Sequence, residues 1–449
     1  MNAPTTRHDS ALSRRAVLKT SAAMLAAPAF AGAAARPAPV LRIGLVGCGG
    51  RGTGAAVQAL RADPHTRLVA MGDVFGDRLE QSLSAIKGEF ESDAAARIDV
   101  PAERRFLGFD AYERVIDAGV DVVLLTSYPC FRPEHLHAAV RAGKHVFAEK
   151  PVAVDATGIR SCLESAAIAE RNNTALLVGF CWRFHPGMRE AFAKLHAGTI
   201  GDVVSAYTNY HAGTLAKHPR KPDWSDLEFQ MRNWWHFTWI SGDHIVEQSV
   251  HSVDRLAWAM RDVMPARVTC LGGRAARSGP EHGNVFDHFS AVYEYADGRR
   301  AFHSAAQIDG IPGDNKDYLF CSRGLGTIDS WGARFPFTAL PAAGEKPAMI
   351  WDGKGDAADS AQMYQVEHNE LFASIRAAET GGKAFNNGVA AAHSCLMAIM
   401  ARMAAYTGKS VSWDQALNSP ENLVPPSNAL KFGPMPAPEV AVPGRTRLA

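Results

Sequence analysis

The stretch VLRIGLVGCGGRG, residues 40–52, decides the fold of this 449-residue chain. Its first seven residues are mostly apolar and end at a glycine, which is typical of a strand buried in a parallel sheet. The glycines then follow the spacing Gly47-x-Gly49-x-x-Gly52, and residues 53–62 are predicted to form a helix. Such a turn lets the main chain approach a pyrophosphate that rests on the helix N-terminus, so the stretch predicts a dinucleotide site.

The same alternation of strand and helix continues to about residue 180. Further strands are predicted at 66–71, 120–125, 144–148 and 175–180, and helices around 78–86, 133–142 and 155–171. This order predicts an α/β region with a doubly wound parallel sheet, the Rossmann fold.

Beyond residue 184 the pattern changes. Longer strands are predicted at 202–211, 266–271, 285–295, 299–307 and 316–321, and helices at 244–260, 361–378 and 389–406. The turn Ala296-Asp297-Gly298 predicts a hairpin between two of these strands. We therefore expect a C-terminal α+β domain built on a large, mostly antiparallel open sheet.

The N-terminus has the order of a secretory signal: a basic segment with Arg14 and Arg15, then a small-residue apolar stretch over 20–35. The paired arginines resemble a twin-arginine signal, which predicts a periplasmic protein with no membrane span after cleavage. The alternative is a membrane anchor, but the run is short and mostly alanine. The predicted organisation is a signal peptide (1–35), a Rossmann domain (36–183), an α+β domain (184–418) and a Pro- and Ala-rich C-terminal strap (419–449).

Composition excludes several classes of function. The formal net charge is +1 and no basic stripe is interleaved with aromatic residues, which argues against nucleic-acid binding. The seven cysteines are scattered singly, which fits neither a disulfide framework nor a zinc site. The histidines His211, His244 and His251 lack metal-ligand spacing, so we predict no metal.

An acidic residue stands where a dinucleotide fold needs one. Asp73 follows the predicted strand 66–71, about twenty residues after Gly52, where an acid would hold the ribose hydroxyls. This favours NAD over NADP, because the acid would repel a 2′-phosphate, although Arg78 nearby keeps NADP as an alternative. The other interpretation is that Asp73 only caps the next helix.

A second motif, Glu149-Lys150-Pro151, follows the strand 144–148. A parallel sheet delivers these residues to its carboxyl edge, where ligands bind. A lysine there can hydrogen-bond a substrate hydroxyl and ease loss of its proton as hydride leaves. An ordinary surface lysine is the alternative.

The glycine turn, the Glu-Lys-Pro motif and the segment GDHIVEQSVHSVD (242–254) together resemble the Gfo/Idh/MocA oxidoreductases, relatives of glucose–fructose oxidoreductase and inositol dehydrogenase, over residues 40–413. The resemblance implies hydride transfer between a nicotinamide cofactor and a sugar, polyol or related cyclic alcohol. It implies that Lys150 and His251 handle the hydroxyl proton, with Glu247 where the family often has aspartate. It adds Ser127 at the ribose. Arg183 follows the last predicted parallel strand at the domain junction, so it is a candidate for contact with the nicotinamide or the substrate. The predicted cofactor-binding residues are Gly47, Gly49, Gly50, Arg51, Gly52, Asp73, Ser127, Glu149, Lys150 and Arg183.

Spacing gives an independent argument for one catalytic pair. Glu247 and His251 are four residues apart, so on one helix they would share a face. The carboxylate would then orient the imidazole and raise the pKa of His251. The alternative is that Glu247 and His251 form a hydrogen-bonded polar pair in the core and have no catalytic role. Aromatic residues form a weaker group of candidates for the cleft, together with one histidine: Trp224, Trp234, Trp235, Trp239, Tyr207, Tyr210 and His211.

Two other functions stay open. One is an NAD-dependent glycoside hydrolase that oxidises a sugar transiently and cleaves it by elimination. The other is a cofactor-binding scaffold without catalysis. An exported enzyme would meet few free nicotinamides, so we expect a tightly bound cofactor. A homodimer or homotetramer is expected by analogy with open-sheet proteins.

Overall fold

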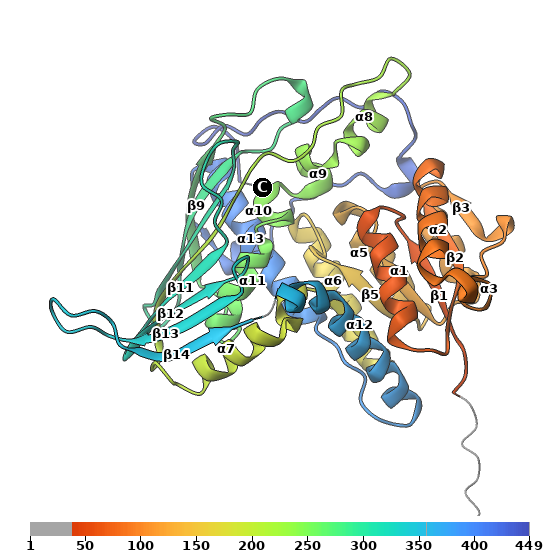
Figure 1. Cartoon of the computed structure of the whole chain (residues 1–449). Helices are drawn as coiled ribbons and strands as arrows, with labels where there is room; N and C mark the ends of the chain where they lie inside the picture. Colours follow the sequence, from red (N-terminus) through yellow and green to blue (C-terminus); the bar gives the residue numbers. More distant parts are fainter. Residues whose placement is uncertain (1–37, 356, 449) are drawn as a thin grey trace, which may run out of the picture. The chain divides into compact units, whose positions relative to one another are not determined.

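The computed structural model describes residues 38–355 and 357–448, and the predicted signal peptide lies outside these residues. The described chain contains one six-stranded and one nine-stranded sheet (Figure 1). From Val40 onward the contacts group the chain into a single compact unit. The boundaries 36–183, 184–418 and 419–449 therefore stay predictions.

The first sheet is entirely parallel and has the order β3-β2-β1-β4-β5-β6. Its strands are β1 (Leu41–Val46), β2 (Thr66–Asp73), β3 (Arg105–Leu107), β4 (Val122–Leu125), β5 (His145–Glu149) and β6 (Leu176–Gly179). The order reverses between β1 and β4, and ligands of open parallel sheets bind at such a point, beyond the carboxyl ends of the strands. The predicted Rossmann sheet is confirmed.

Helices cover both faces of this sheet, which explains why its strands are continuous apolar runs. One face packs on α4 (Ala111–Asp117), α5 (Arg132–Arg141) and α6 (Ala156–Arg171). The other packs on α1 (Gly50–Ala62), α2 (Gly76–Phe90) and α12 (Ala357–Glu379). A short helix, α3 (Ala94–Arg97), follows α2. The helix α12, although it comes late in the sequence, thus completes the core of the N-terminal sheet.

The second sheet has the order β14-β13-β12-β11-β7-β10-β9-β8-β15 and is antiparallel except for the pair β7 and β10. Its strands are β7 (Val203–Ala212), β8 (Arg267–Gly273), β9 (His288–Glu294), β10 (Arg300–Gln307), β11 (Lys316–Cys321), β12 (Gly324–Asp329), β13 (Arg334–Ala339), β14 (Met349–Lys354) and β15 (Val411–Ser412). This confirms the mostly antiparallel sheet and the β9–β10 hairpin. The strands β12 to β14 were not predicted.

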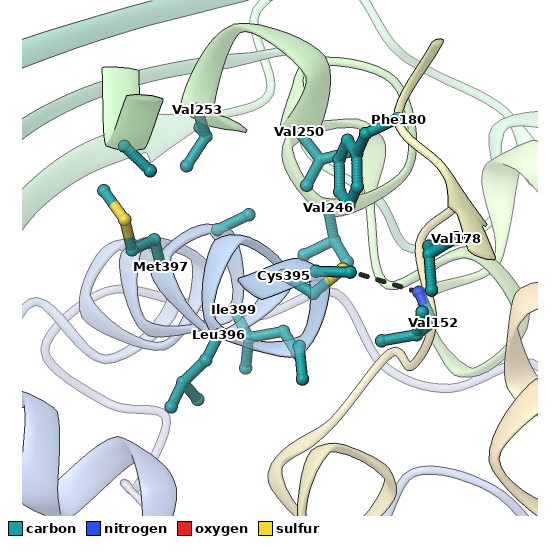
Figure 2. Close-up of a cluster of buried hydrophobic side chains, with 14 of the residues drawn as sticks. Val152, Val178, Phe180, Val246, Val250, Val253, Cys395, Leu396, Met397 and Ile399 are labelled. Atoms are coloured by element: carbon teal, nitrogen blue, oxygen red, sulfur yellow. Dashed lines mark hydrogen bonds between the residues drawn. The ribbon is translucent and has the colours of Figure 1, made fainter. Parts of the chain in front are cut away.

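The helix α13 (Gly388–Thr407) lies between the second sheet and α6. It is the one helix in the described part of the chain that is long and apolar enough to cross a bilayer, and 83% of that apolar window is buried inside the protein. Figure 2 shows Cys395 of α13 facing Val152, whose main-chain N donates to its sulfur at 3.4 Å. Burial on this scale marks α13 as the core helix that joins the two sheets.

The predicted helix 244–260 is wrong in one respect, because it is broken. The structure forms α10 (His244–Glu247) and α11 (Val250–Ala259) instead. At the break, Ser249 N donates to His244 O, and Ser249 Oγ pairs with His303 Nε2 of β10 at 2.7 Å. Glu247 and His251 therefore belong to two different helices and not to one continuous helix.

The remaining helices flank the second sheet or precede α10. They are α7 (Pro186–His196), α8 (Asp226–Arg232), α9 (Thr238–Ser241) and α14 (Trp413–Leu417).

Residues 419–448, the predicted strap, contain no long helix or strand. It is tied to the N-terminal part by Leu423 N, which donates to Asp155, and by Ser427 Oγ, which donates to Glu134, both at 2.8 Å. Further along, Gly444 N donates to Thr407 O at the end of α13.

Candidate functional site

The glycine turn connects β1 to α1 and opens into a cleft. Gly47 has φ +95°, and a Cβ there would lie 2.3 Å from Ser127 N. A Cβ on Gly52 would lie 2.0 Å from Gly47 O, so this glycine lets the helix pack against the turn. By contrast, a Cβ on Gly49 or Gly50 would meet nothing within 4 Å. Since α1 also has no side-chain cap, its first N–H groups are free of side-chain partners and suit an anion such as a pyrophosphate.

Asp73 fixes this turn to the end of β2. Its Oδ2 accepts a hydrogen bond from Cys48 N at 2.6 Å and its Oδ1 accepts one from Phe75 N at 2.8 Å. Burial raises the pKa of Asp73. The bond to Phe75 N holds the residue before α2, but α2 has no side-chain cap, so the capping interpretation is wrong. Asp73 also lines the cleft.

Ser127 follows β4 and lies in the cleft wall with two residues that the sequence did not single out. Its Oγ pairs with His135 Nδ1 at 3.0 Å. Arg132 is buried and donates to the carbonyl oxygens of Ser127, at 2.6 Å, and of Pro151. It therefore joins the loop after β4 to the loop after β5, which carries Lys150.

Arg51 and Glu149 meet each other at the wall of the cleft. Arg51 Nε lies 2.5 Å from Glu149 Oε1, and its other end lies 3.2 Å from Glu367 Oε1 on α12. The guanidinium also stands over the ring of Tyr364 at 4.7 Å. Burial raises the pKa of Glu367. The glycine turn is thus held against α12 by an ion-pair cluster whose two α12 residues were not predicted.

Lys150 and Glu247 form a buried ion pair in the lining of the cleft. Lys150 Nζ lies 2.8 Å from Glu247 Oε1 and 2.5 Å from its main-chain oxygen. Their side chains are only 12% and 6% exposed. The contact joins the end of β5 to the end of α10.

His251 lines the same cleft but has no bond to Glu247. Among the described residues, its Nδ1 has no hydrogen-bond partner. Burial lowers the pKa of His251 well below its usual value, and the charges of Lys150 and Arg255 lower it further. The expectation that Glu247 would raise this pKa is wrong, because burial dominates and the Glu247 carboxylate is ion-paired with Lys150. His251 is therefore a neutral imidazole at neutral pH.

The far wall of the cleft is aromatic. Tyr210 of β7 lines it, as do Trp234 and Trp235, whose rings stack at 3.8 Å. Burial and the charge of Glu247 raise the pKa of Tyr210 to about 12. The other aromatic and histidine candidates, Tyr207, His211, Trp224 and Trp239, are not in the cleft lining.

Together these groups surround a cleft of about 860 Å³, large enough for a dinucleotide end and a small substrate. It brings together the predicted residues Gly47, Gly49, Gly50, Arg51, Gly52, Asp73, Ser127, Glu149, Lys150, Glu247 and His251. Arg183 is the exception: its guanidinium is bound to Asp254 at 2.9 Å and to Asp262 at 2.6 Å, outside the cleft lining. Within residues 38–355 and 357–448, no group of three His, Cys, Asp or Glu residues is arranged to hold a metal ion.

Comparisons with known proteins agree with this geometry. Residues 41–180 match the model of the Gfo/Idh/MocA oxidoreductase family, NAD-binding Rossmann fold. Inositol 2-dehydrogenase 3 of Saccharopolyspora erythraea is 26% identical over 361 residues, 79% of this chain and 91% of the relative. The 2,7-anhydro-N-acetylneuraminate hydratase of Escherichia coli is 25% identical over 40% of this chain and 44% of its own.

Solved structures show the same fold. A levoglucosan dehydrogenase in complex with NADH and levoglucosan superposes with a TM-score of 0.63 at 16% identity, covering 83% of this chain and 99% of the other. The aldose-aldose oxidoreductase of Caulobacter crescentus gives 0.60 at 20% identity, with the same coverage.

Proposed function

We propose that this NAD(P)-dependent oxidoreductase, whose residues 41–180 match the Gfo/Idh/MocA family model, oxidises a secondary alcohol of a sugar, polyol or related cyclic alcohol. One observation carries the proposal: the Lys150–Glu247 ion pair and the neutral His251 line the same cleft as the open glycine turn. The relatives that act on inositol and levoglucosan support this class of substrate.

The residues of the turn fit the proposed cofactor. Gly49 and Gly50 leave room for a pyrophosphate, Asp73 suits the ribose hydroxyls and Ser127 lies in the adjoining wall. We propose NAD rather than NADP, because Asp73 would repel a 2′-phosphate and the Arg78 guanidinium is bound to the Tyr128 hydroxyl at 2.8 Å. When bound, the nicotinamide accepts the hydride from the alcohol carbon.

The chain's own residues handle the proton. The Lys150 ammonium, held by Glu247, donates a hydrogen bond to the substrate oxygen and stabilises negative charge that develops there. His251 accepts the hydroxyl proton, which its unprotonated state at neutral pH allows. The substrate would thus lose its hydroxyl proton to His251 and a hydride from its carbon to the bound cofactor, leaving a ketone.

The test uses the purified mature protein with NAD⁺ or NADP⁺ and a panel of myo-inositol, levoglucosan, D-glucose and D-gluconate. We expect reduced nicotinamide to form with at least one compound, with NAD⁺ preferred. The variant Lys150→Met should form no reduced nicotinamide. The matched control Lys383→Met, which removes a surface ion pair with Glu170, should keep the activity. Failure to bind either nucleotide would contradict the proposal. Release of nitrophenol from nitrophenyl glycosides without added nicotinamide would instead favour the glycosidase.

We also propose that the protein is exported to the periplasm and keeps its cofactor. The strap supports retention, since Phe432 packs against Phe75 and Phe109, with ring centroids 5.7 Å apart in each case. Phe75 is the residue whose N–H Asp73 binds, and Phe109 lines the cleft. Mass spectrometry of the purified protein should detect NAD.

Cell fractionation tests the proposed export. It compares wild type with an Arg14→Lys, Arg15→Lys variant, which should no longer be exported.

For the oligomeric state we propose pairing of two copies through the open face of the second sheet. Strand register places Phe302, Tyr207 and Tyr318 side by side on β10, β7 and β11. Phe302 and Phe320 are among the exposed large apolar residues. Light scattering should give a dimer or tetramer, and Phe302→Lys with Phe320→Lys should give a monomer.

A further inference from the structure

A buried chain of hydrogen bonds leads from the second sheet to the substrate side of the cleft. Arg277 Nη2 donates to Gln307 Oε1, and Gln307 Nε2 donates to Gln248 Oε1. Arg277 and Gln307 are only 6% and 2% exposed. Gln248, at the break between α10 and α11, is half-buried and lines the cleft. The chain therefore ends at a side chain that a substrate can touch.

The first member of the chain sets its direction. A guanidinium has only donors, so the atom of Gln307 that faces Arg277 must be the carbonyl oxygen. The amide nitrogen of Gln307 then faces Gln248, whose oxygen must accept. This leaves the NH₂ group of Gln248 on the other side, and no described residue accepts from it. The orientation of an amide, which is otherwise ambiguous, is here fixed by the network.

Gln248 stands beside the reacting groups. It directly follows Glu247, the partner of Lys150, and its main-chain oxygen accepts a hydrogen bond from His251 N at 3.4 Å. Lys150 already presents a donor to this end of the cleft. A substrate here meets donors from two sides, so it needs two oxygens that accept.

We propose that Gln248 is a specificity-determining residue, locked by Arg277 and Gln307 as a hydrogen-bond donor to a second oxygen beside the reacting hydroxyl. This inference rests on the proposed function and refines it. The enzyme selects vicinally oxygenated alcohols, such as a diol, and discriminates against an alcohol that lacks the neighbouring oxygen. An unpaired donor at Gln248 is the physical reason for the discrimination.

The variant Gln307→Glu tests this without changing the cleft lining. The new carboxylate accepts from Arg277 and cannot donate to Gln248, so the amide of Gln248 must turn its NH₂ towards it and its oxygen towards the cleft. With the best compound of the panel, KM should rise about 10- to 100-fold, while kcat stays within about threefold. NAD affinity and the unfolding temperature serve as controls and should not change.

A double-variant comparison separates this effect from a general structural one. In a Gln248→Ala background, Gln307→Glu should no longer change KM, because the residue through which it acts is gone. Wild type should also prefer cyclohexane-1,2-diol to cyclohexanol by about tenfold or more in kcat/KM, and Gln307→Glu should reduce this preference.

A second experiment does not depend on catalytic turnover by the enzyme. In ¹⁵N-labelled protein, the Gln248 side-chain amide is assigned as the signal lost in Gln248→Leu. Its protons should exchange quickly with water in wild type and more slowly in Gln307→Glu, where the carboxylate holds one of them. Unchanged exchange would overturn the inference, as would an unchanged KM for a compound that wild type oxidises. If wild type oxidises no compound, the proposed function fails by itself, and the exchange rates alone decide whether Gln248 is locked as a donor.

Discussion

Lys150 Nζ donates to both the carboxylate and the main-chain oxygen of Glu247, at 2.8 and 2.5 Å. The main-chain bond positions the lysine independently of the carboxylate, whereas the carboxylate balances its charge. Glu247 Oε2 has no partner among the described residues, so the carboxylate depends on the lysine as well. In the proposed mechanism, Glu247 therefore acts on the proton chemistry through Lys150 and not through His251.

Replacing Glu247 by Gln should separate the positioning of Lys150 from the balance of its charge. The main-chain bond remains, but the buried ammonium loses its counter-ion, so we expect kcat to fall about tenfold to 100-fold and the free energy of unfolding to fall by about 3 kcal/mol. Steady-state kinetics and urea unfolding measure the two effects. Glu247→Asp keeps the charge and should retain most activity. Glu370→Gln, at the half-exposed pair with Arg189, should change neither quantity and is the matched control.

Two glycines of the turn should respond oppositely to alanine. Gly49→Ala places its methyl group in open space, so the fold should be unaffected while NAD binding weakens by about tenfold or more. Gly52→Ala places the methyl group 2.0 Å from Gly47 O, so the protein should lose about 2 kcal/mol or more of stability. Thermal unfolding and NAD titration of both variants provide the test. Equal NAD affinity in Gly49→Ala and wild type would contradict a pyrophosphate at this turn.

Much of the first sheet could be predicted because its strands are buried on both faces and leave continuous apolar runs. β3 was missed because it is three residues long and partly exposed. Strands β12 and β13 were missed because Gly324, Gly326 and Pro336 interrupt their alternating pattern. Residues at strand ends, such as Asp73 and Lys150, could be singled out because a parallel sheet brings these ends to one edge.

The rest of the cleft depends on contacts between distant segments. Tyr364 and Glu367 reach the glycine turn because α12 packs on α1. No local sequence pattern indicates that these two helices pack together. Gln248 is oriented by Gln307, 59 residues away. The helix break before α11 depends on a bond between Ser249 and His303, so local spacing alone predicted one continuous helix.

The low pKa of His251 predicts an unusual pH profile. An ordinary histidine base would lose activity as the pH falls through about 6.5. Since burial keeps His251 neutral below that value, kcat/KM for alcohol oxidation should show no loss with midpoint near 6.5, and any loss should have a lower midpoint. His251→Asn should reduce kcat about 100-fold or more at all these pH values. A wild-type midpoint near 6.5 would assign the base to another group.

His135 makes a prediction about stability. Burial, with a smaller contribution from the charge of Arg132, lowers the pKa of His135 to about 3 in the folded protein. The unfolded chain binds the proton near pH 6.5, so His135 contributes its full stability above that pH and loses it progressively towards pH 3. One pH unit below 6.5, the loss is about 1.4 kcal/mol. His135→Gln can keep the bond to Ser127 but does not titrate. Between pH 7.5 and 5.5, the variant's free energy of unfolding in urea should therefore fall by about 1.4 kcal/mol less than that of wild type. Equal losses in the two proteins would show that His135 is protonated in the folded state.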